Sequence, residues 1–201
     1  MELPIDPDAV ERSARRADYR DGLLELFAAA LMATLAAGWA FQPGIVGLLS
    51  LPFIFFGWKV MAKLKERITY PRIGYSGYNP ERQQTNAKGM AGFLALAIAI
   101  VIVMILVFGE SSIYNELRRA APLFSGLAFA GGFRYLAEKS GMARHHLLVV
   151  ASVVTGLAVW WQDDGNDYSA MLVFLLIMAA FLFVMGVASL AVFLMRNPAH
   201  E

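Results

Sequence analysis

The sequence predicts an all-α integral membrane protein with six transmembrane helices and with both termini in the cytoplasm. Three observations predict this fold. Hydrophobic residues make up 58% of the 201 residues and charged residues 16%, whereas soluble domains carry roughly 25% charged residues. Six apolar segments of about 20 residues, the length that crosses a bilayer, follow one another along the chain. Lys and Arg residues gather in alternate connections between these segments, as they do where basic loops stay in the cytoplasm.

The first element is a cytoplasmic segment, residues 1–21. It contains no cleavable signal peptide pattern, because MELPIDPDAVERSARRADYR is polar and carries both acids and bases. Residues 8–20 are predicted to form a short amphipathic helix after Asp6-Pro7, since proline is favoured at the start of a helix. Its basic residues recur every three or four positions and therefore share one side: Arg12, Arg15, Arg16 and Arg20.

A transmembrane domain is predicted over residues 22–195. The six spans are expected at about 22–41, 43–62, 90–109, 120–137, 146–162 and 169–195. Span 90–109 is the most apolar, and span 120–137 is the weakest. Pro52 is expected to bend the second span because it removes one backbone donor. Residues 196–201 form a short cytoplasmic tail.

The distribution of basic residues predicts the orientation of the spans. With both termini inside, 15 of the 17 Lys and Arg residues fall on the cytoplasmic side, and only Arg118 and Arg119 fall outside. Trp39, Trp160 and Trp161 lie at the predicted outer ends, where tryptophan rings act as interfacial anchors. The net charge of +1 gives no reason to expect a nucleic acid partner.

A basic, tyrosine-containing loop, residues 63–89, connects the second and third spans. Its turn-forming residues and Pro71 are expected to end the second helix, with residues 67–70 and 72–75 forming short extended pieces. The simplest role of the loop is an interfacial anchor that sets the topology, and the alternative is a docking surface for anionic lipid headgroups or a protein partner. The candidate binding residues are Lys63, Lys65, Arg67, Tyr70, Arg72, Tyr75 and Arg82.

Ionisable residues inside spans, which by default mark substrate or proton paths, are scarce. Glu25 near the start of the first span and Arg134 near the end of the fourth form a possible polar pair. The favoured alternative pairs Glu25 with Arg20 or with another basic residue at the inner interface. His145 and His146 are adjacent and point about 100° apart on a helix, and no HExxH-type spacing occurs. The sequence therefore predicts no metal site and no cofactor, and it specifies no enzyme.

Small residues at four-residue spacing predict close contacts between helices. Packing inside the bundle is the favoured interpretation, and an interface between copies of the chain is the alternative. The small residues are Ala29, Ala33 and Ala37; Gly126 and Ala130; Ala128 and Gly132; Ser152 and Gly156.

Several stretches resemble a group of small bacterial multi-span membrane proteins. They are YRDGLLELF (19–27), KERITYPRIGY (65–75), a Gly- and Ala-rich fourth span, and FLMRNP (193–198). TYPRIGY is the specific part of this resemblance. The resemblance implies a bacterial inner-membrane protein and carries over no catalytic residue. RHH at 144–146 departs from the pattern, in which aromatic residues follow the arginine.

Three functions fit the sequence. The first is a non-enzymatic accessory, scaffold or regulatory component that uses its basic cytoplasmic face, with anionic lipids and a second membrane subunit or copy as partners. The alternative is a transporter or channel for a neutral or lipid-like solute, with a path lined by Ser50, Ser125, Ser152 and Thr155. The second alternative is an interfacial lipid-acting enzyme, whose reactive groups would be Glu25, Arg134, His145 or His146.

Overall fold

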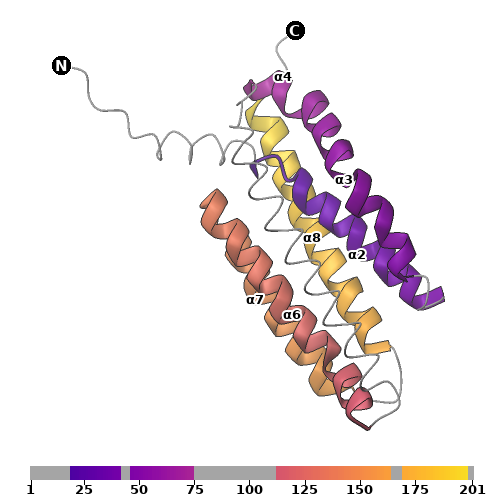
Figure 1. Ribbon diagram of the computed structural model, residues 1–201. Coiled ribbons are helices and arrows are strands. Elements are labelled where there is room, and N and C mark those ends of the chain that lie inside the picture. Colours follow the sequence, from indigo (N-terminus) through magenta and orange to yellow (C-terminus); the bar gives the residue numbers. More distant parts are fainter. Residues whose placement is uncertain (1–18, 42–45, 75–111, 164–168, 199–201) are drawn as a thin grey trace.

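The computed structural model describes residues 19–41, 46–74, 112–163 and 169–198 (Figure 1). No strand occurs within these ranges, so the predicted all-α fold class is confirmed for this part of the chain. The helices are α2 (Leu23–Phe41), α3 (Val46–Ile68), α4 (Tyr70–Ile73), α6 (Ser112–Ser140), α7 (Ala143–Gln162) and α8 (Ser169–Arg196).

Three helices, α2, α7 and α8, are long and apolar enough to cross a membrane. They coincide closely with the predicted spans at 22–41, 146–162 and 169–195. The predicted spans at 43–62 and 120–137 fall on α3 and α6, but their crossing of a membrane stays a prediction. The predicted span at 90–109 lies outside the described residues, as do residues 8–18 of the helix predicted at 8–20.

The end of α3 differs from the prediction. The helix continues through Lys63 and Arg67 to Ile68, instead of giving way to an extended segment. After one turn residue, Thr69, the short helix α4 carries Pro71 in its first turn. The prediction was wrong because a proline at the start of a helix occupies a position whose N–H has no helical acceptor. Gly74 follows α4 as its C-terminal cap, with a φ of 82°.

Helix α8 is the centre of the described bundle. In Figure 1 it lies between the α2–α3 pair and the α6–α7 hairpin, and it contacts α2, α6 and α7. Phe174, Met178 and Leu182 of α8 are almost fully buried in the core. The ring of Phe129 in α6 stacks on that of Phe174, with 6.1 Å between their centroids. The core therefore runs along α8 and joins the two pairs of helices.

The α6–α7 contact is built on small residues. A Cβ atom added to Gly126 would lie 2.5 Å from the carbonyl oxygen of Ser152, and one added to Gly156 would lie 2.7 Å from that of Pro122. Real Cβ atoms do not approach oxygen so closely, so only glycine permits this separation of the backbones. Gly126, Ser152 and Gly156 of the predicted small-residue stripes therefore form an internal helix contact, the favoured interpretation.

The small residues of α2 follow a different spacing from the predicted one. Ala29 and Ala36 are buried in the core, whereas Ala33 and Ala37 are exposed. Residues seven positions apart lie on nearly the same face of a helix, because two turns contain about 7.2 residues. Residues that repeat every four positions drift away from that face, so the buried small residues are spaced by seven. Only Ala29 of the predicted stripe therefore belongs to the packed face.

The outer face of α7 is apolar along the length of the helix. Its exposed large side chains recur every three or four residues and are not covered by the rest of the described bundle. A continuous apolar surface of this kind is unfavourable in water and suits the hydrocarbon of a membrane. The residues are Leu147, Val150, Val154, Leu157 and Trp161.

Candidate functional site

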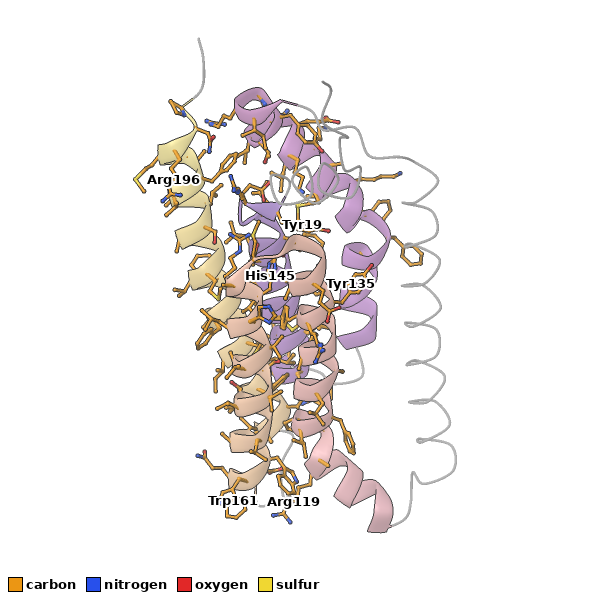
Figure 2. All side chains as sticks on the ribbon, turned by 90° about the vertical axis from the view of Figure 1, so that its left-hand side faces the viewer. Tyr19, Arg119, Tyr135, His145, Trp161 and Arg196 are labelled. Atoms are coloured by element: carbon orange, nitrogen blue, oxygen red, sulfur yellow. The ribbon has the colours of Figure 1, made fainter. Side chains whose placement is uncertain are left out.

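Buried polar side chains gather at one end of the bundle, which we call the basic end. The starts of α2 and α7 and the ends of α3, α6 and α8 meet there. Figure 2 shows Tyr19, His145 and Arg196 toward this end, and Arg119 and Trp161 at the opposite end. The buried polar and charged residues at the basic end are Asp21, Glu25, Lys65, Thr69, Ser140 and His145.

Three of these side chains form a hydrogen-bonded series across three helices. Ser140 is the last residue of α6, and its Oγ lies 2.7 Å from Nδ1 of His145 in the first turn of α7. Nε2 of the same ring lies 3.1 Å from Oε1 of Glu25 in α2. Because Nε2 can donate to the carboxylate while Nδ1 accepts from the hydroxyl, a neutral imidazole satisfies both contacts.

Arg144 adds a positive charge to this series. Its Nε lies 2.8 Å from Oε1 of Glu25, but neither the Arg144 Nε–H nor Oε2 of Glu25 has a hydrogen-bond partner among the described residues. The contact is therefore an ion pair held by charge more than by a directed hydrogen bond. The terminal nitrogens of Arg144 donate to the backbone carbonyls of Tyr19 and Arg20.

A second polar contact fixes the start of α2. Oδ1 of Asp21 accepts the backbone N–H of Leu23 at 3.1 Å, as a capping side chain does. Oδ2 of Asp21 accepts the hydroxyl of Thr69 at 2.6 Å, and both side chains are buried. Gly22 follows with a φ of 73°, and a Cβ there would lie 2.5 Å from the carbonyl oxygen of Gly186. This corner thus joins α2 to α8 and to the α3–α4 junction.

Tyr19 lies between α7 and α3. Its ring meets that of His145 edge-on, with 6.5 Å between centroids. The ammonium nitrogen of Lys65 lies 5.5 Å from the centre of the Tyr19 ring, within range of a cation–π interaction. The side chain of Lys65 is only 8% exposed because the ring and its surroundings cover it.

The Ser140–His145–Glu25 series has the connectivity of a nucleophile, a base and an orienting carboxylate. Catalysis also requires that a substrate reach the hydroxyl, and here Ser140 is 1% and His145 0% exposed. In addition, Oγ of Ser140 accepts the backbone N–H of Met142 at 3.3 Å. The geometry therefore suits a latch between helix ends. We call Glu25, Ser140, Arg144 and His145 the polar latch.

The predicted pair of Glu25 and Arg134 does not form in this structure. Arg134 lies on the exposed face of α6, and its Nε is 3.1 Å from Oε1 of Glu138 one turn later. Glu25 pairs with Arg144 and His145 instead. Of the three other groups considered with Glu25 for an enzyme, only His145 joins it, because Arg134 and His146 are exposed.

The predicted binding residues of the 63–89 segment have different environments. Lys63 and Arg67 are exposed, whereas Lys65 is buried beneath Tyr19. Tyr70 and Arg72 are half-buried, and the guanidinium of Arg72 donates to the carbonyl of Ile68 at 2.6 Å. Tyr75 and Arg82 lie outside the described residues.

The exposed basic residues of α3 form a ladder, which we call the α3 ladder. Lys59, Lys63 and Arg67 are four residues apart, so they lie on one side of the helix and continue toward the basic end. Exposed apolar side chains follow the same spacing beside them: Phe56, Val60 and Leu64. An exposed apolar row and an exposed basic row therefore run side by side along α3 between residues 56 and 67.

The residues predicted to line a solute path differ in burial where the structure describes them, because Ser152 is buried and Ser125 and Thr155 are half-buried. Ser152 is fully buried, and its hydroxyl donates to the carbonyl of Val149 at 3.0 Å. The hydroxyl of Ser125 contacts the sulfur of Met171 at 3.8 Å. The side chain of Ser50 is not among those that the structure describes. A surface hollow near the opposite end is almost wholly apolar and includes neither described serine: it is lined by Val154, Leu157, Ala158, Trp160, Trp161 and Gln162.

Sequence reasoning did not identify Asp21, Thr69 or Ser140 as members of this region. For Asp21 a signal was present, because an aspartate two residues before an apolar helix is a typical capping residue. Thr69 and Ser140 carry no such signal, since their partners are distant or depend on the α6–α7 turn.

Comparison with models of known families, with curated proteins and with solved structures found no match to this chain. The contacts and charges of its own residues are therefore the basis for a functional assignment.

Proposed function

We propose that this protein is a non-enzymatic accessory or scaffold component of a bacterial inner membrane, with six spans and both termini in the cytoplasm. Its basic end binds the anionic headgroups of the cytoplasmic leaflet, and a second membrane subunit or copy is the expected protein partner. Three helices of suitable length and composition, α2, α7 and α8, support the membrane location. The excess of basic residues in alternate connections supports the orientation.

The α3 ladder is the observation that carries this proposal. The adjacent apolar row of Phe56, Val60 and Leu64 suits the hydrocarbon region, and the long side chains of Lys59, Lys63 and Arg67 can extend from it to the headgroup layer. Long basic side chains near the end of a span extend toward the interface in this way. Each one near an anionic leaflet contributes about 1 kcal/mol of attraction.

The polar latch supports the non-enzymatic part of the proposal. Its hydroxyl and imidazole are buried and engaged with each other, and they join helix ends. The exposed ionisable side chains described at this end include the bases Lys63, Arg67 and Arg196 as well as the acids Glu66 and Glu138. The basic side chains attract phosphate and carboxylate.

Native mass spectrometry of the full chain, released from nanodiscs that contain phosphatidylglycerol and phosphatidylcholine, tests the proposal. The wild-type protein should retain phosphatidylglycerol preferentially. Reversing two charges with Lys63→Glu and Arg67→Glu removes two attractive contributions of about 1 kcal/mol each and adds repulsion, so the apparent affinity should fall by at least about 30-fold. Arg119→Glu, at the opposite end, is the matched control and should leave retention unchanged.

Equal retention of the two lipids by the wild-type protein would contradict the proposal. So would an equal loss in the α3 ladder variant and the Arg119→Glu control, since the basic end would then have no special role. A bound neutral solute in place of anionic lipid would instead favour the carrier function.

A further inference from the structure

Tyr19 and Arg20, which lie four and three residues before the start of α2 at Leu23, are held by cationic side chains of two other helices. From α7, the guanidinium of Arg144 donates to the backbone carbonyls of Tyr19 and Arg20. From α3, the ammonium of Lys65 lies over the Tyr19 ring. We call Tyr19 and Arg20 the strap, because they connect the preceding basic segment to the bundle.

We propose that the strap is an intramolecular occupant of Arg144, and that the phosphate of an anionic lipid headgroup competes for the same guanidinium and releases the strap. This inference rests on the proposed function, because it requires the basic end to face an anionic leaflet. It identifies Arg144 as a phosphate-binding residue and the strap as the element that phosphate binding moves.

The acceptors that now occupy Arg144 are weaker than phosphate. Backbone carbonyls are neutral, whereas a phosphate carries a charge and accepts two parallel hydrogen bonds from one guanidinium. Arg144 is 19% exposed, in the first turn of α7 at the basic end. Among the described residues, the hydrogen bonds of the terminal nitrogens that a headgroup would replace are those to the two carbonyls.

Glu25 keeps Arg144 in position for either occupant. The carboxylate lies 2.8 Å from Nε of Arg144, and the terminal nitrogens of Arg144 face the strap. The contact of Glu25 with His145 joins α2 to α7 through atoms that do not belong to the strap. Release of the strap therefore does not require the contact between α2 and α7 to break.

Hydrogen exchange of the peptide that covers residues 19–26 measures the release in the full chain. The amides of Leu23 and Leu26 bond to Asp21 and to the carbonyl of Gly22, so they report opening at the start of α2. In the wild-type protein, exchange should be faster in nanodiscs rich in phosphatidylglycerol than in phosphatidylcholine alone. Arg144→Ala should exchange about tenfold faster than wild type in phosphatidylcholine and should not respond to lipid charge; tenfold corresponds to losing about 1.4 kcal/mol.

Arg134→Ala is the matched control, because it removes an arginine from the same end that pairs only with Glu138 among the described residues. It should behave like the wild-type protein in both bilayers. Glu25→Gln keeps a similar shape and should also accelerate exchange, so it tests the same point if Arg144→Ala fails to fold.

The inference is overturned if lipid charge does not change exchange in the wild-type protein, or if neither Arg144→Ala nor Glu25→Gln accelerates it. These outcomes are independent of the lipid-retention test. Retention of phosphatidylglycerol through the α3 ladder with an unresponsive strap would remove this inference alone. Loss of preferential retention would remove the proposed function.

Discussion

Nε2 of His145 lies 3.1 Å from Oε1 of Glu25, although 120 residues separate them in the chain. Both side chains are almost fully buried, and they join the first turns of α7 and α2. A buried carboxylate without partners would be costly, so this contact requires the two helix starts to remain together. Arg144 on the same carboxylate oxygen and Ser140 on the other ring nitrogen extend the contact to the strap and to α6.

Replacing His145 should destabilise the bundle. His145→Ala leaves the hydroxyl of Ser140 without its imidazole acceptor and leaves Glu25 with Arg144 alone, so we expect a loss of about 1–3 kcal/mol in the free energy of unfolding. Thermal unfolding in a mild detergent, followed by circular dichroism, measures it. His146→Ala changes the exposed neighbour and should have no measurable effect; equal losses in the two variants would show that the latch does not stabilise the fold.

The glycine contact between α6 and α7 should tolerate no added methyl group. Gly126→Ala places a Cβ 2.5 Å from the carbonyl oxygen of Ser152, whereas Gly132→Ala places one in open space among the described residues. Both changes gain the same helix propensity of about 1 kcal/mol, so their difference reports the steric cost alone. We expect Gly126→Ala to be less stable than Gly132→Ala by about 1–3 kcal/mol in reversible unfolding. Similar stabilities would mean that the helices separate without cost.

Asp21 should contribute more to stability than its partner Thr69. Thr69→Val removes only the hydroxyl that donates to Oδ2, whereas Asp21→Ala removes that bond and the cap on Leu23. Loss of the cap costs about 1 kcal/mol, and a buried hydroxyl left without its acceptor costs about 1–3 kcal/mol. A double-mutant cycle measures the coupling between the two side chains, and a coupling energy near zero would contradict their contact.

Lipid retention at the α3 ladder should depend on salt. Screening shortens the range of charge interactions from about 10 Å at 0.1 M to about 3 Å at 1 M ionic strength. We therefore expect phosphatidylglycerol binding in nanodiscs, titrated at several salt concentrations, to weaken as salt rises. The Lys63→Glu and Arg67→Glu variant should show a flatter dependence than the wild-type protein. A salt-independent preference would show that groups other than these charges select the lipid.

Several features could be predicted from sequence because they depend on local composition. Apolar length locates α2, α7 and α8, since a run of about 20 apolar residues is helical and suits a membrane wherever it lies in the chain. The small-residue spacing predicted close helix contacts at Gly126 and at Gly156, and the structure decided that these two positions meet each other. The end of α3 was harder to predict, because Pro71 is compatible both with a turn and with the first turn of a new helix.

The sequence by itself determined the helical class, the apolar segments and the concentration of basic residues in alternate connections, because these follow from the chemistry of neighbouring residues. Only the tertiary structure decided which polar groups meet. From the sequence, several basic residues were candidate partners for Glu25. In the folded bundle Arg144 and His145 contact it, whereas Arg134 lies at the surface. The physical reason is that a contact between residues 120 positions apart depends on how the helices pack against one another. That packing is set by the side chains on all the contacting helix surfaces at once, so no single segment predicts it.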